Sequence, residues 1–269
     1  MPDISAILLT SVFQLSRSGV YYESRKKHKD LELRDQILAV LATNPSYGHR
    51  RISIALHLGK RRVRRVMNLY QILPYKRKAR WRKRRDERRA PEPFQNEIKN
   101  QWPIQPNHIW VSDFTYLKHQ TKFLYLATVM DLFTREIVGW HISSKHTKEL
   151  VMGALADAVM QQKLHTPSFV HSDQGVEYAA ADYTNFAKHC GIQISMSKKA
   201  SPWENGYQES FFNNFKTDLG LEFDRYTSTG ELVEAIHQTI RYYNQSRIHT
   251  TLKMSPSQFR YQTSLRKSV

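Results

Sequence analysis

The stretch that decides the fold is Ser201-Pro-Trp-Glu-Asn-Gly-Tyr-Gln-Glu-Ser-Phe-Phe-Asn-Asn-Phe-Lys216. Pro202 suits the first turn of a helix, where its fixed φ is helical and its missing N–H is not needed. At about 100° per residue, Glu209 points to one side of this helix together with Asn213 and Lys216. A single glutamate on a helix is usually a solvated surface residue, so Glu209 becomes informative only if other functional groups lie opposite it. The other side is apolar and should face a core; it is formed by Phe211, Phe212, Phe215 and Leu219.

Two aspartates upstream are candidates to meet Glu209. Asp113 lies in Trp110-Val-Ser-Asp-Phe-Thr115, on a predicted strand. Asp173 directly follows another predicted strand, where open α/β sheets place their sites. Three carboxylates in one place repel strongly unless cations neutralise them. Oxygen ligands select hard ions, so Mg²⁺ or Mn²⁺ fits a site that handles phosphates. Two such ions about 4 Å apart would activate an attacking water or hydroxyl and stabilise the leaving oxygen, with no nucleophilic residue required.

The amino-acid composition limits the classes of molecule that this protein is expected to bind. The chain has 269 residues, and 41 lysines and arginines against 24 acids give a net charge of +17. A polyanion, either nucleic acid or an anionic membrane surface, is therefore the first partner to consider. Cys190 is the single cysteine, which excludes internal disulfides and zinc sites that need two thiolates. No stretch approaches twenty apolar residues, so we expect a soluble protein of two or three domains.

Residues 1–30 are expected to form a short helical lead-in, and residues 31–74 a helix-turn-helix domain. Apolar residues recur at helical spacing, and Leu58-Gly59 makes the turn before a third helix over residues 60–70. That helix has one apolar stripe, and a cationic surface that suits insertion beside phosphates is formed by Lys60, Arg61, Arg62, Arg64 and Arg65. The alternative is a solvated basic helix. The sequence does not reveal which of these side chains contact bases.

Residues 75–101 are expected to form a linker. Its first half is nearly continuous lysine and arginine, so it cannot bury itself and should be extended when free. It could become ordered along a phosphate backbone by releasing counterions, or it could be a flexible spacer.

Residues 102–221 have the pattern of an α/β domain. Predicted strands and helices follow one another as three strands, a helix, a strand, a helix, a strand and a helix. This order predicts a mixed five-stranded sheet with helices packed on its faces. The strands are expected at residues 109–117, 123–130, 137–142, 168–171 and 193–196, and helices at 149–162 and 182–189. Residues 222–269 are expected to add an amphipathic helix at 229–243 and a tail packed on this domain.

The three acids are separated by sixty and then thirty-six positions. This spacing and the sequence motifs around the acids resemble those of the DDE transposase and retroviral integrase superfamily. The nearest match is the catalytic protein of bacterial insertion sequences with two overlapping frames, usually called OrfB. The resemblance covers most of the chain. The motifs and segments that carry the resemblance are Trp110-x-x-Asp113-Phe-Thr, His171-Ser-Asp173-x-Gly-x-x-Tyr178, Asn205-x-x-x-Glu209-Ser-Phe-Phe, Tyr47-Gly-His-Arg-Arg51, residues 123–140 and Tyr243-Asn-x-x-Arg247-x-His249 with Pro256.

The resemblance implies an RNase H-like core that binds two Mg²⁺ ions, which Mn²⁺ can replace. It also implies that Asp113, Asp173 and Glu209 are both the catalytic residues and the metal ligands, and that Lys216 lies near DNA. Family members often act as a fusion with an upstream-frame protein, produced by frameshifting. We therefore expect double-stranded DNA, an upstream-frame partner and a dimer or higher oligomer on DNA, in the cytoplasm of a bacterium at the nucleoid.

Other polar residues compete for a place in the site. Asp131 is expected to cap a strand end, Glu177 to lie at the surface, and His171 to be a core or supporting residue. Glu204, five positions before Glu209, lies on a different face of the helix and favours its dipole. Asn205 either holds the helix start or contacts DNA. The tail residues expected to pack on the core are Tyr243, Asn244, Arg247 and His249.

The resulting hypothesis is a transposase that cuts a phosphodiester at an element end and transfers the freed 3′-hydroxyl to another phosphodiester. The family implies a circular intermediate before insertion. The alternatives are a catalytically silent DNA-binding regulator or domesticated remnant, and a nuclease for RNA–DNA hybrids or junctions on the same fold. The predicted helix-turn-helix favours duplex DNA as the substrate.

Overall fold

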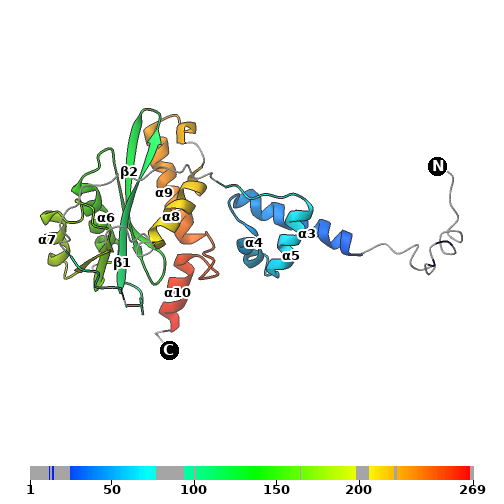
Figure 1. The fold of residues 1–269 in the computed structure, drawn as a ribbon, viewed down its shortest axis with the longest axis horizontal. Helices are drawn as coiled ribbons and strands as arrows, with labels where there is room; N and C mark the ends of the chain where they lie inside the picture. Colours follow the sequence, from blue (N-terminus) through cyan, green and yellow to red (C-terminus); the bar gives the residue numbers. More distant parts are fainter. Residues whose placement is uncertain are drawn as a thin grey trace. The chain divides into compact units, whose positions relative to one another are not determined.

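The computed structural model describes residues 12, 14, 25–76, 94–99, 101–163, 165–197, 206–220 and 223–266. The chain divides into two compact units, residues 1–74 and 75–269 (Figure 1). Most of the predicted lead-in and of the basic linker lies outside the described residues. Within the described ranges, no helix has the length and apolar character needed to cross a membrane.

The part of the first unit that the structure describes contains three helices: α3 (Arg25–Thr43), α4 (His49–Ala55) and α5 (Lys60–Leu69). The predicted apolar stripe of α5 is confirmed, because Val63, Val66 and Met67 are buried there. Helix α3 begins within the predicted lead-in, so residues 25–30 are part of the helical unit. The physical reason is Asp30, which is only 5% exposed and forms an ion pair with Arg65 of α5.

The second unit contains one five-stranded sheet with the strand order β3-β2-β1-β4-β5. Strand β1 pairs antiparallel with β2 and parallel with β4, while β2–β3 is antiparallel and β4–β5 is parallel. The predicted mixed sheet is therefore confirmed. The strands are β1 (Ile109–His119), β2 (Lys122–Asp131), β3 (Ile137–Ser143), β4 (Phe169–Ser172) and β5 (Gln193–Met196).

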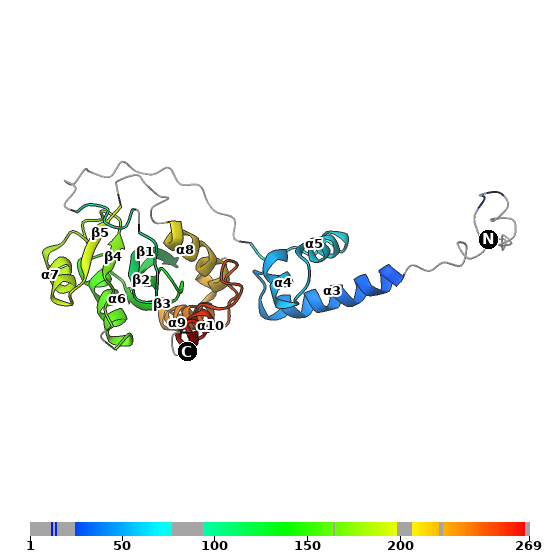
Figure 2. The ribbon, with the colours of Figure 1, turned by 90° about the horizontal axis from the view of Figure 1, so that it is seen from below.

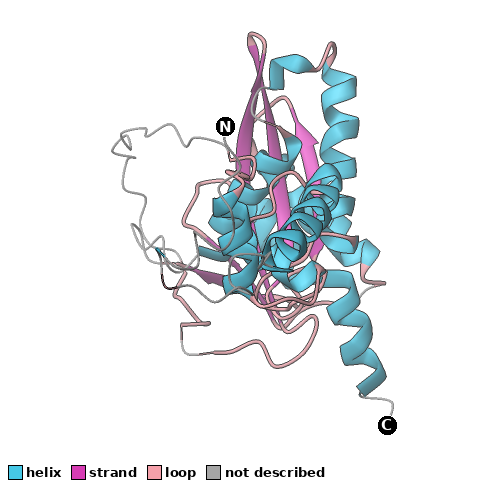
Figure 3. Cartoon of the chain, turned by 90° about the vertical axis from the view of Figure 1, so that its right-hand side faces the viewer, coloured by secondary structure: helices cyan, strands magenta, loops and turns pink. Residues whose placement is uncertain are grey.

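Helices cover both faces of the sheet (Figures 2 and 3). One core joins α6 (Lys148–Gln161) and α7 (Ala181–His189) to the sheet residues whose side chains point to the same face as Trp110. The other core joins α8 (Gly206–Leu219) and α9 (Thr229–Gln245) to the sheet residues whose side chains point to the same face as Val111. This alternation follows from strand geometry, in which successive side chains point to opposite faces.

The C-terminal tail packs on the sheet and on α8, as the sequence predicts. Tyr243 donates its hydroxyl hydrogen to the Arg135 carbonyl at 3.1 Å. Asn244 exchanges two 2.9 Å hydrogen bonds with the backbone of Ile137 at the start of β3. Arg247 is buried against Asp218 of α8. These contacts are structural, because each one joins the tail to backbone or to α8.

Two further elements were not predicted from the sequence. A short 3₁₀ helix spans Phe223–Arg225, and α10 spans Pro256–Arg266. Pro256 begins α10, as expected for proline at a first helical position. Arg260 then forms an ion pair with Glu136 at 2.8 Å, which fixes this helix to the β2–β3 connection.

Candidate active site

Asp113 lies where the sheet changes width. Strand β4 pairs with β1 only over Ile109–Val111, whereas β2 accompanies β1 as far as His119. Asp113 is the first residue beyond this parallel pairing whose side chain points to the same face as Val111, which is the face that α8 covers. One of its carboxylate oxygens accepts a 2.8 Å hydrogen bond from the Phe114 N–H. Pairing with β2 fixes its backbone and the Phe114 N–H holds its carboxylate, on a part of β1 that β4 does not pair with.

Asp173 follows β4 directly. The register pairs His171 with Val111, so Asp173 stands level with Asp113, two residues further along both strands. Its carboxylate accepts a 3.0 Å hydrogen bond from the Gly175 N–H, which closes a tight turn after the strand. Asp173 itself is exposed to solvent.

Glu209 is brought to the sheet by its neighbour Gln208. The Gln208 side-chain nitrogen donates to the Val111 carbonyl at 2.7 Å, and its amide oxygen accepts from the Thr128 hydroxyl at 3.2 Å. Thr128 is the cross-strand partner of Asp113, so this fully buried amide holds the first turn of α8 beside Asp113. Glu209, one residue on, is exposed.

Gln208 was missed by the sequence reasoning, although a signal existed. It lies three and four positions before Phe211 and Phe212, and therefore on the buried stripe of α8. A polar residue at an apolar position predicts a buried hydrogen bond, but not its acceptors.

The three acids lie within electrostatic range of one another. Burial, then the charge of Asp173 and, to a smaller extent, the charge of Glu209 together raise the pKa of Asp113 to about 7. The Phe114 N–H and the Lys216 ammonium act in the opposite direction. The structure thus brings Asp113, Asp173, Glu209 and Lys216 together. Within the part of the chain that the structure describes, however, no three acidic, histidine or cysteine side chains form a closed set of metal ligands.

The chemistry of this donor set suits a hard divalent cation. It consists of carboxylates from two neighbouring strand positions and one facing helix, without a thiolate or imidazole. A proton on Asp113 relieves the repulsion near neutral pH, and a cation would relieve it more completely. The exposure of Asp173 and Glu209 leaves the site accessible to a large substrate.

Asp131, by contrast, has a structural role, as the sequence predicts. It is fully buried and accepts N–H hydrogen bonds from Phe133 and Thr134, each at 2.8 Å, and from Asn107. Burial raises the pKa of its carboxyl, and these backbone donors oppose the rise.

The expectation that Glu177 lies at the surface is wrong. Its side chain is only 11% exposed, and it pairs with His146 at 3.3 Å. His146 in turn stacks on Tyr125, with ring centroids 5.3 Å apart. His171 is a core residue, as predicted, and its Nδ1 lies 2.9 Å from the Ser195 hydroxyl. Glu204 and Asn205 lie outside the described residues.

The predicted cationic surface of α5 is present with one change. Four of its cations are exposed: Lys60, Arg61, Arg62 and Arg64. Arg65, the fifth, is half-buried and donates to Asp30 of α3 at 2.7 Å. This hydrogen-bonded pair lowers the pKa of Asp30. Arg65 therefore links two helices, and four cations remain directed to solvent.

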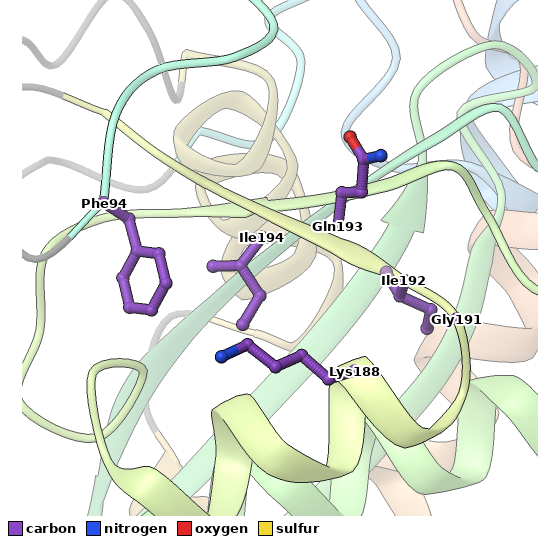
Figure 4. Close-up of a pocket in the computed structure, with 6 residues that line it drawn as sticks. All are labelled: Phe94, Lys188, Gly191, Ile192, Gln193 and Ile194. Atoms are coloured by element: carbon purple, nitrogen blue, oxygen red, sulfur yellow. The ribbon is translucent and has the colours of Figure 1, made fainter.

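A hollow of about 360 Å³ lies at the β5 edge (Figure 4). Its lining contains no acidic residue and consists of Phe94, Lys188, Gly191, Ile192, Gln193 and Ile194. It offers no ligand set for the chemistry considered above.

Comparison with known proteins agrees with this arrangement. Two family models described as "Integrase core domain" match residues 103–202 and 190–256. The chain is 30% identical to the "Putative transposase InsK for insertion sequence element IS150" of Escherichia coli, over 93% of this chain and 91% of that protein. It is 33% identical to the "Insertion element IS600 uncharacterized 31 kDa protein" of Shigella sonnei, over 94% and 97%.

Among the solved structures with a similar fold, we take one as an example. It is the intasome of simian T-cell lymphotropic virus in complex with PP2A regulatory subunit B56 gamma, with a TM-score of 0.51 and 18% identity, over 80% of this chain and 74% of that one. The sheet order, the helices on both faces and the match to insertion-sequence proteins over more than 90% of both chains lead to one conclusion. The chain belongs to the insertion-sequence transposases of the DDE transposase and integrase superfamily, with an RNase H-like integrase core.

Proposed function

We propose that this transposase cuts DNA at the ends of its element and joins the freed 3′-hydroxyl to a second phosphodiester, with Asp113, Asp173 and Glu209 as the metal-binding catalytic residues. The observation that carries the proposal is the convergence of Asp113 with Asp173 and Glu209 at one end of the β1–β4 pairing, which together with burial raises the pKa of Asp113 to about 7. Proteins seldom gather like charges without a function for them, and strongly perturbed carboxyls mark functional sites.

The residues fit two divalent ions, Mg²⁺ or Mn²⁺. Such ions supply a nucleophile at neutral pH and stabilise the leaving oxygen. Asp113 contributes a rigid ligand, because β2 and the Phe114 N–H hold it. Asp173 is held by its turn, and Glu209 by the Gln208 anchor of α8. Small side-chain movements of the exposed acids would complete the ligand set around the ions.

Substrate DNA would be held by positive charge in both units. The exposed cations of α5 suit phosphate contacts, which would add a salt-dependent, sequence-independent share of the affinity. Lys216 lies close enough to lower the pKa of Asp113 and would contact a phosphate near the cut bond. Two ends must react together, so we expect a dimer or higher oligomer on DNA. An upstream-frame protein fused by frameshifting would assist end recognition.

The test compares wild type with Asp173→Asn on end-labelled DNA carrying the element's terminal repeats, with Mg²⁺. Wild type should cut, and the variant should not. Asp182→Asn is the matched control, because Asp182 is an exposed acid on α7 that pairs with Lys148. Equal cutting by wild type and Asp173→Asn would refute the assigned residues. Salt-sensitive binding without any cutting would instead favour the silent regulator.

A further inference from the structure

The β1–β2 hairpin extends past the end of β4, next to the proposed catalytic acids. Because β4 pairs with β1 only as far as Val111, no strand in the described part of the chain pairs with the β4-side edge of β1 from the level of Asp113 onward. The β1–β2 ladder continues to the pair His119–Lys122. Figure 1 shows this two-stranded ribbon rising beyond the other strands. A substrate that passes over Asp113 would therefore also pass along the hairpin.

Two aromatic side chains lie on this hairpin with large exposed areas. Tyr116 and Phe123 are 40% and 41% exposed, whereas Phe211 and Phe215 of α8 are almost fully buried. The two rings lie on a cross-strand diagonal, 5.8 Å apart between centroids and at 79° to each other. Such a pair fixes both ring orientations and still presents aromatic surface to solvent.

Two lysines lie beside the aromatic pair, and one of them connects it to the acids. The Lys216 ammonium lies 5.3 Å from the centre of the Tyr116 ring, and the same charge lowers the pKa of Asp113. Lys118 is directly opposite Phe123 in the ladder and is exposed; Lys122, at the hairpin end, is also exposed but points to the other face of the hairpin. Aromatic rings interspersed with lysines are the pattern that binds unpaired nucleic acid.

Strand geometry explains how one substrate could meet both groups. Asp113 and Tyr116 are three residues apart, roughly 10 Å along the strand, and point to opposite faces. Lys216 comes from α8, on the Asp113 face, and reaches the ring of Tyr116 on the other face. The open edge of β1 is therefore spanned by a cation, which suits a phosphate at the edge and a base beyond it.

We propose that Tyr116 and Phe123 form a stacking platform for an unpaired DNA base beside the phosphodiester that is cut, with Lys216 on the adjoining phosphate. This inference rests on the proposed function. Unpairing and unstacking a base costs free energy, and stacking on an aromatic ring offsets that cost without reading the base's identity. The platform would thus stabilise an opened DNA end in the site.

The experiment measures binding of the full chain to two end duplexes without Mg²⁺. One duplex is fully paired; the other has a few mismatched terminal base pairs and a fluorescent adenine analogue that is quenched on stacking. Wild type should quench the analogue and prefer the opened end. Tyr116→Leu should bind the opened end on the order of tenfold more weakly and lose the quenching. Tyr116→Phe should behave as wild type, since stacking needs the ring and not the hydroxyl.

Tyr261→Leu is the matched control, because Tyr261 is an aromatic residue of α10 that is 65% exposed. Unchanged opened-end binding and quenching in Tyr116→Leu would overturn the platform. So would equal weakening on both duplexes together with a lower melting temperature, because that result indicates a cross-strand pair that only stabilises the hairpin. A wild type that quenches the analogue but cuts neither duplex with Mg²⁺ would support the platform and refute the proposed cleavage.

Discussion

Asp113 and Asp131 are the same residue type on paired strands, three rungs apart in the β1–β2 ladder, yet their surroundings are opposite. Asp131 is satisfied by backbone N–H groups of three residues. Asp113 has one such donor and has Asp173 and Glu209 within electrostatic range. Burial raises the pKa of both carboxyls. The difference teaches that the arrangement of donors and charges around a buried acid, rather than burial itself, separates a structural acid from a candidate catalytic one.

The same substitution at both positions should give opposite phenotypes, and the largest effect is expected at Asp113. Asp113→Asn should lower DNA cleavage on the order of a thousandfold, because metal coordination supplies several kcal/mol to the reaction. Its free energy of unfolding should stay the same or rise, since one of three repelling charges is removed. Cleavage assays and thermal unfolding of the same sample measure both quantities. Substantial residual cleavage would remove Asp113 from the metal site.

Asp131→Asn should instead lower stability and leave chemistry intact. The new amide nitrogen would face the Asn107 N–H, which then loses its acceptor inside the protein. An unsatisfied buried donor costs about 2 kcal/mol, or roughly 4–8 °C in melting temperature for a domain of this size. Cleavage per folded molecule should be unchanged at a temperature well below the transition. An unaltered melting temperature would contradict the capping role.

The pH dependence of the metal-free protein offers a finer comparison. The pKa of Asp113 is about 7 in the folded chain, against 3.8 for an unperturbed aspartate. Between these values the folded state binds more protons than the unfolded state, so stability should fall as pH rises from about 4 to 7. Asp113→Asn should flatten this fall, and Mg²⁺ should offset it near pH 7 in wild type. Chemical unfolding at several pH values tests this; identical slopes for wild type and variant would show that Asp113 is not the titrating group.

How much the sequence can predict depends on how local the signal is. The strands around Asp113 and Asp173 can be predicted from short apolar runs. The three acids can be picked out by their spacing and by the sequence motifs in which they lie. The ion pair of Asp30 with Arg65, the pairing of Glu177 with His146, and α10 were not predicted. Each pair joins residues about thirty positions apart, and its existence depends on how two elements pack. No periodicity or local word encodes such a contact.

Gln208 lies between these two cases and gives the smallest expected effect. Its place on the apolar stripe of α8 is local, but its bonds to Val111 and Thr128 are tertiary. Gln208→Leu keeps the apolar packing and removes both bonds, so α8 should remain helical while Glu209 is held less firmly opposite Asp113. We expect cleavage to fall about tenfold, because a 1 Å misplacement of a reacting group is costly. Stability should fall by about 1 kcal/mol, because the buried Val111 carbonyl loses its donor and the buried Thr128 hydroxyl loses its acceptor.

The Mg²⁺ concentration for half-maximal cleavage by Gln208→Leu should rise, which a purely structural anchor would leave unchanged. Gln238→Leu, at an exposed position of α9, is the control. If both variants need the same Mg²⁺ concentration as wild type, the buried amide holds the helix but does not position the glutamate.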